Sequence, residues 1–124
     1  MKNVITLSPE GKVKRIRIGD GEVPLDVLQR AVGGHIEYAP SIINGIVMLV
    51  NEEDQLKGFK VNEMATALYA YGHLDPLVGT VAFVHVEGEN TFGLYDTVAD
   101  KLERDLASED NFEAMLKRIA LIGA

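Results

Sequence analysis

Two nearly continuous apolar runs constrain the fold of this chain more than any other feature. INGIVMLV ends at Val50, and TVAFVHV begins at Thr80. Short apolar runs bounded by turn residues are typical of strands that are buried on both faces. We therefore expect a domain built on a β-sheet, with these two runs as central strands.

The N-terminal segment predicts a β-hairpin over residues 1–18. NVITL and KVKRIRI are separated by SPEG, which supplies turn chemistry. The alternation in the second strand is imperfect, because Val13, Ile16 and Ile18 share one face only if a bulge falls near Lys14. A second strand pair is expected from HIEYA and INGIVMLV, and TFGLY predicts one more short strand.

Two helices are expected between the strands. The first starts at Pro24 and ends before Gly33–Gly34, with Leu25, Leu28 and Val32 at helical spacing. The second runs from Glu63 to about Tyr71, with Asn62 as its N-cap and Gly72 after its end. Its expected apolar stripe is Met64, Leu68 and Tyr71.

A pair of helices is expected over residues 96–122. Thr97 and Asp100 form a candidate capping box for the first, and Ser108 is a candidate N-cap for the second. The apolar stripe of the second helix consists of Phe112, Met115, Leu116 and Ile119. As an alternative to packing within the chain, the two helices could bury this stripe against a second copy and form a homodimer. The predicted order is ββαββαββαα, an α+β domain with a mainly antiparallel sheet.

Length and composition bound the class of protein. A chain of 124 residues is expected to form one domain, residues 1–124, and it contains no cysteine. Disulfide scaffolds, thiolate zinc sites and cysteine nucleophiles are therefore excluded, and the composition fits a reducing cytoplasm. No apolar run approaches the roughly 18 residues of a membrane span, so no membrane partner is expected.

The charge is divided unevenly along the chain. Residues 1–18 carry five basic residues against Glu10, a net +4, which leaves −11 for the rest of a chain whose total is −7. An acidic body disfavours binding to nucleic acids. KVKRIR is interpreted first as a solvated strand face, and alternatively as a contact for a phosphate or an acidic partner.

The titratable residues do not form a known catalytic or metal-binding pattern. The three histidines lack zinc spacing, and Glu52, Glu53 and Asp54 lack the spacing of a calcium loop. His73 beside Asp75 is the best candidate for acid–base chemistry, although Asp75 fits a turn cap better. We therefore predict no catalytic residue, no metal and no cofactor, and favour a non-enzymatic protein.

Three segments in the middle of the chain form a recognisable pattern: VGGHIEYAP, GIVMLVNEEDQLKGFKVNEMATALY and DPLVGTVAFV. With them the chain resembles the domain-of-unknown-function 3846 family of small bacteriophage, plasmid and conjugative-element proteins. The resemblance covers about residues 20–86, while the hairpin and the closing helices lie outside it. It implies a cytoplasmic accessory protein of a mobile element and supplies no catalytic residues.

Three functional hypotheses follow. The first is a non-catalytic module that binds a host or element-encoded protein. The second is a small-ligand-binding, sponge-like protein or low-activity enzyme, with a pocket lined by Glu37, Asn62, Asp75 and Thr80. The third is an acidic DNA mimic. Its carboxylates would come from the C-terminal helices: Asp96, Asp100, Glu103, Asp105, Glu109, Asp110 and Glu113.

Overall fold

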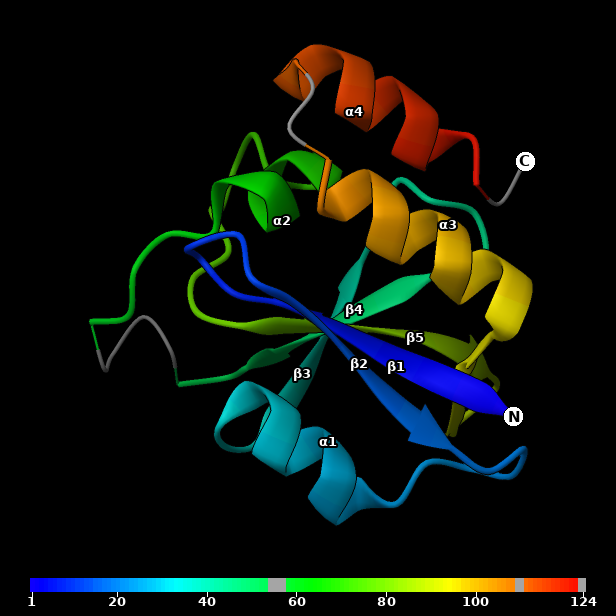
Figure 1. Cartoon of the computed structure of the whole chain (residues 1–124). Helices are drawn as coiled ribbons and strands as arrows, with labels where there is room; N and C mark the ends of the chain where they lie inside the picture. Colours follow the sequence, from blue (N-terminus) through cyan, green and yellow to red (C-terminus); the bar gives the residue numbers. More distant parts are fainter. Residues whose placement is uncertain (54–57, 109–110, 123–124) are drawn as a thin grey trace.

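The computed structural model describes residues 1–53, 58–108 and 111–122 (Figure 1). The strands are β1 (Lys2–Leu7), β2 (Val13–Ile18), β3 (Ile36–Pro40), β4 (Val47–Asn51), β5 (Val81–Glu87), β6 (Asn90–Phe92) and β7 (Leu94–Tyr95). The helices are α1 (Leu25–Val32), α2 (Glu63–Leu68), α3 (Asp96–Leu106) and α4 (Phe112–Ala120). The α+β class is confirmed and the order broadly matches, with two short strands where one was expected.

Every pairing in the sheet is antiparallel. The main strands are ordered β2-β1-β5-β4-β3, β6 pairs with β5, and β7 pairs with the start of β1. The two apolar runs form β4 and β5, which lie next to each other inside the sheet, as their composition predicted.

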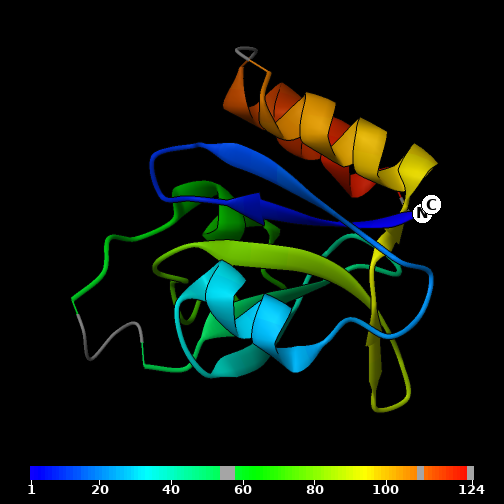
Figure 2. The same ribbon diagram turned by 60° about the horizontal axis from the view of Figure 1, so that its bottom comes forward.

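Helices cover both faces of this sheet (Figures 1 and 2). One core contains Met48 and Phe83 and lies under α2, α3 and α4, while the other contains Leu49 and Ala82 and lies under α1. Neighbouring residues of a strand point to opposite faces, so a strand between two cores needs apolar residues at every position. This requirement accounts for the continuous apolar runs.

The hairpin has no bulge near Lys14, so Val13, Ile16 and Ile18 do not share one face. The register runs unbroken from Lys2 opposite Ile18 to Leu7 opposite Val13. Val13 packs on the core below α2–α4, whereas Ile16 and Ile18 pack on the core beside α1. Because both faces of the hairpin are covered, its apolar residues need not share one face.

The first two helices differ from expectation at their ends. Leu25 is 57% exposed, and α1 buries Leu28 and Val32 instead. The helix α2 ends at Leu68 and not near Tyr71, which is also exposed. The chain leaves the helix at Tyr69, which is extended and forms a bridge with Ser41 beside β3. Because Tyr69 needs an extended backbone for this contact, α2 cannot continue for another turn.

The closing helices use other caps than those expected. Tyr95 precedes α3 and makes no side-chain cap, so the Thr97–Asp100 capping box does not form. Asn111 caps α4, because its Oδ1 accepts from the backbone N–H groups of Glu113 and Ala114 at 2.9 and 3.3 Å. An Asn immediately before the first turn satisfies these donors directly, and Ser108 is not needed for that role.

The apolar stripe of α4 is largely buried within the chain. Met115 and Ile119 are buried, and α4 packs on α3 and α2, while Phe112 of the expected stripe is 46% exposed. Within the described ranges, none of the helices has the length and apolarity to cross a membrane.

Candidate functional site

The basic hairpin sends its charges to two different faces. Arg15 points to α3, where its guanidinium lies 2.5 Å from Asp100, 3.4 Å from Asp96 and 3.6 Å from Glu103. Its side chain is only 17% exposed. The interpretation of KVKRIR as a solvated strand face is therefore wrong for Arg15, which holds α3 onto the sheet.

Asn3 completes this charged cluster from β1. It is fully buried, and its Nδ2 donates to the Leu94 carbonyl at 3.2 Å and to Asp96 Oδ1 at 2.7 Å. The hydrogen bond from Asn3, with smaller contributions from Arg17, the N-terminus and Arg15, holds the pKa of Asp96 below its usual value. Asp96 is therefore ionised over a wider pH range in the folded state.

We expect Asp96→Asn to lower stability at neutral pH, with a difference from wild type that shrinks in acid. A carboxyl whose pKa is lower when folded contributes stability above its unfolded pKa of about 3.8 and loses it as pH falls through the folded value. Urea midpoints at pH 7 and pH 3 for both proteins check this. Equal midpoints at pH 7 would contradict it.

Most of the acids considered for DNA mimicry form ion pairs with arginines of the same chain. Three of them bind Arg15, and Asp105, which is 8% exposed, lies 3.4 Å from Arg118. Glu109 and Asp110 lie outside the described residues. Carboxylates paired with the chain's own arginines are poor mimics of a phosphate row, so this geometry does not favour mimicry.

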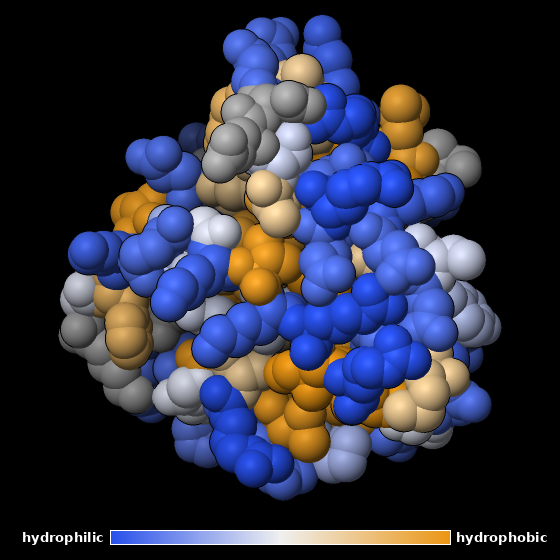
Figure 3. All heavy atoms as spheres, in the orientation of Figure 1, coloured by the Kyte–Doolittle hydropathy of each residue, from blue (hydrophilic) through white to orange (hydrophobic). Residues whose placement is uncertain are grey.

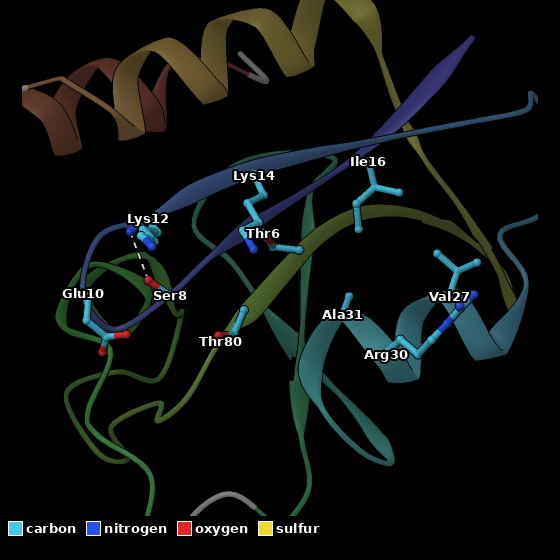
Figure 4. Close-up of a pocket in the computed structure, with 10 residues that line it drawn as sticks. All are labelled: Thr6, Ser8, Glu10, Lys12, Lys14, Ile16, Val27, Arg30, Ala31 and Thr80. Atoms are coloured by element: carbon cyan, nitrogen blue, oxygen red, sulfur yellow. Dashed lines mark hydrogen bonds between the residues drawn. The ribbon is translucent and has the colours of Figure 1, made fainter.

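A groove lies between the hairpin and α1 (Figure 4). It has a volume of about 580 Å³, within the range of roughly 300–1,000 Å³ that is usual for small-molecule sites. Ile16, Val27 and Ala31 supply apolar lining, and the face in Figure 3 shows apolar surface between hydrophilic side chains where the hairpin approaches α1. We call this the hairpin groove.

The polar lining of the hairpin groove is cationic and rich in hydroxyl groups. Thr6, Ser8 and Thr80 contribute hydroxyls, while Lys12 and Lys14 contribute ammonium groups (Figure 4). The Ser8 hydroxyl already accepts from the Lys12 backbone N–H at 3.0 Å. Hydroxyl and ammonium groups can donate together to a bound anion, and the apolar floor can hold an uncharged portion of the same ligand.

The two lysines of the hairpin groove differ from the arginines in their partners. Arg30 turns back along α1 to Asp26 at 3.1 Å (Figure 4). Among the residues that the structure describes, no carboxylate lies within 4 Å of the ammonium group of Lys12 or Lys14. Glu10 lines the groove but is not close enough to pair with either.

Two of the four predicted ligand-binding residues lie together on the opposite side of the sheet. Glu37 and Asp75 line a hollow of about 190 Å³ with Tyr69. Burial raises the pKa of the Tyr69 hydroxyl, and the charges of Asp75 and Glu37 raise it further. The hollow is smaller than usual ligand sites, and in the described ranges no three acids or histidines are grouped to hold a metal.

The other two predicted residues lie elsewhere. Asn62 is 1% exposed; its Nδ2 donates to the carbonyls of Leu7 and Gly79, both at 3.0 Å, and its Oδ1 accepts from Ala65 N–H at 3.1 Å. Its side chain thus ties α2 to the end of β1 and to the segment before β5. Thr80 lines the hairpin groove. Ligand binding by these four residues stays a prediction, but they do not line one pocket.

Other candidates from the sequence were the pair His73 and Asp75 and the acids that follow β4. His73 and Asp75 line different hollows. Glu52 and Glu53 are exposed after β4, and Asp54 lies outside the described residues. Gly34 leaves room for Asn51, since a Cβ on Gly34 would lie 2.7 Å from Asn51 Nδ2. Gly33, Gly34 and Asn51 belong to the segments that resemble the family, and the side chain of Asn51 packs against the two glycines.

Lys12 and Lys14 belong to KVKRIR, for which contact with a phosphate was the alternative interpretation, but neither was named among the four predicted ligand-binding residues. A usable signal exists, because a strand alternates its faces and Lys14 therefore points away from Arg15. Assigning the groove also required α1 to lie against the same face, which no local pattern encodes.

The fold and the groove define a small α+β protein with an antiparallel sheet covered on both faces and an open cationic hollow at one side. Residues 1–107 match the family model described as domain of unknown function (DUF3846), and the chain belongs to this family. The resemblance seen over residues 20–86 thus extends to the hairpin and α3, and α4 lies beyond it. No match was found among curated proteins or among solved structures.

Proposed function

We propose that this protein binds a small anionic molecule in the hairpin groove without transforming it, as an accessory protein of a phage or mobile element. The observation that carries the proposal is the pair Lys12 and Lys14, which face a hollow of about 580 Å³ with no carboxylate within 4 Å among the described residues. Arg15 and Arg17 pair with acids of α3, and the ammonium group of Lys2 lies over the rings of Phe92 and Tyr95.

Charge favours a small anion over a long polyanion. The chain carries −7 overall, so a nucleic-acid strand running over its surface would be repelled. A molecule confined to the groove experiences mainly the nearby lysines, because charges beyond about 8 Å are screened at physiological salt. A bound anion would also relieve the mutual repulsion of the two ammonium groups.

We expect Lys12→Ala with Lys14→Ala to weaken the binding of inorganic pyrophosphate by roughly 100-fold. Each charge-assisted hydrogen bond contributes about 1.5–3 kcal/mol, close to tenfold or more in affinity. Isothermal titration calorimetry at low ionic strength measures the effect. Lys101→Ala, on the exposed side of α3, is the matched control and should bind as wild type does. Unchanged binding in the double variant, or none in wild type, would refute the proposal.

A second candidate is a protein-binding module, with a host or element-encoded partner. It is supported by exposed apolar side chains beside α2 and α4: Val61, Tyr71, Leu74 and Phe112, exposed by 46–74%. Val61 and Phe112 line one open hollow. Pull-down with wild type and with Leu74→Asp tests this, because a partner of this surface should be lost in the variant. Recovery of a second copy of this chain in the same pull-down would indicate the homodimer through α3 and α4.

A further inference from the structure

We propose that the ligand of the hairpin groove is a free nucleotide, with its phosphate at Lys12 and Lys14 and its base against Phe59. This inference rests on the proposed function and adds the chemical class of the ligand. It comes from a second hollow of about 600 Å³ that continues the first. The two share four lining residues: Glu10, Arg30, Ala31 and Thr80.

The second hollow is suited to a flat ring. Phe59 lines it with its side chain 47% exposed, which leaves much of an aromatic ring in water. Gly58 and Gly79 form part of the same wall at φ angles of 72° and 75°, and a Cβ at Gly58 would meet nothing within 4 Å. A heterocyclic base could therefore stack on Phe59 close to bare backbone.

The shared residues lie where a sugar would connect the two ends. Glu10 accepts hydrogen bonds when ionised, and Thr80 both donates and accepts. Ribose hydroxyls offer donors and acceptors of the matching kind. The carboxylate of Glu10 would repel a phosphate at this point, which directs the anionic end toward Lys12 and Lys14. The linings thus place Lys12 and Lys14 at one end of the groove, hydrogen-bonding groups where the two hollows meet, and Phe59 together with Lys60 at the other end.

Calorimetric titration of the full chain with four probes tests the inference. The probes are adenosine 5′-monophosphate, ribose 5-phosphate, adenosine and a single-stranded hexanucleotide. We expect the monophosphate to bind at least tenfold more tightly than ribose 5-phosphate or adenosine, since only it occupies both ends of the groove. The hexanucleotide should bind no more tightly than the monophosphate.

Phe59→Ala should reduce the affinity for the monophosphate to that for ribose 5-phosphate, and leave the latter unchanged. Phe112→Ala is the matched control, because its ring is equally exposed, at 46%, on another face. Equal affinities for the monophosphate and ribose 5-phosphate, or no effect of Phe59→Ala, would overturn the nucleotide and leave anion binding intact. A preference for the hexanucleotide would overturn the free nucleotide, and failure of every phosphate probe would overturn the proposed function as well.

Discussion

Replacing Asn62 with alanine is expected to lower the free energy of unfolding by roughly 3–5 kcal/mol. The variant loses an N-cap, which contributes about 1 kcal/mol. It also leaves the carbonyls of Leu7 and Gly79 without the amide that bridges them, and each unsatisfied buried group costs about 1–3 kcal/mol. The effect combines a local cap with contacts across 55 and 17 residues of chain.

Urea unfolding of three variants separates these contributions. Asn62→Asp keeps the acceptor for Ala65 N–H but places a carboxylate oxygen against two carbonyls, so it should be nearly as unstable as Asn62→Ala. Asn111→Ala removes the exposed cap of α4 and should cost only about 1 kcal/mol. If Asn62→Ala cost no more than Asn111→Ala, the bridging role would be wrong.

The second large effect is expected for Gly72→Ala, with a loss of about 3 kcal/mol. A Cβ at this position would overlap the backbone carbonyl oxygen of Thr66 at the end of α2. The backbone cannot yield as a flexible side chain would, because Thr66 also bonds to Asn62 and Leu77. Overpacking of this kind commonly costs 1–3 kcal/mol or slightly more.

The matched control for Gly72 is Gly19→Ala. A Cβ at Gly19 would meet no atom within 4 Å, so this variant should unfold at nearly the wild-type urea concentration. Thermal or urea midpoints of the two variants make the comparison. Equal midpoints would show that the turn after α2 relaxes to accept a methyl group, contrary to the packing described above.

Asn62 shows how far sequence reasoning reached. An asparagine directly before a run of helix-forming residues predicts an N-cap, and the structure confirms it. The two carbonyls that Asn62 also binds belong to segments distant in the sequence, and no local pattern indicates them. The same limit explains why the end of α2 was predicted too late, because the helix ends where Tyr69 forms a bridge with the distant Ser41.

The hairpin shows a different limit. Its strands and turn were predictable, but its alternation was judged imperfect because one face was expected to hold every apolar residue. The sheet is covered on both sides, so the simple alternation is correct. Arg15 lies under α3 for the same reason.

The site was the least predictable part. Glu37 and Asp75 do share a hollow, yet Thr80 belongs to the hairpin groove on the other face. Residues at the ends of elements gather only if the layers bring those ends together. The groove joins residues from β1, β2, α1 and the segment before β5, and the phase of each strand and helix decides which side chains enter it.

The most direct measurement of the central claim is a ¹H–¹⁵N NMR titration of the full chain with adenosine 5′-monophosphate and, separately, with pyrophosphate. Both ligands should shift amide signals of residues 8–14, of Arg30 and Ala31, and of Thr80, which surround the hairpin groove. The signals of residues 71–74, near the exposed apolar surface, should stay in place. Shifts confined to residues 71–74 or to the hollow of Glu37 and Asp75, or no shifts with either ligand, would contradict the account.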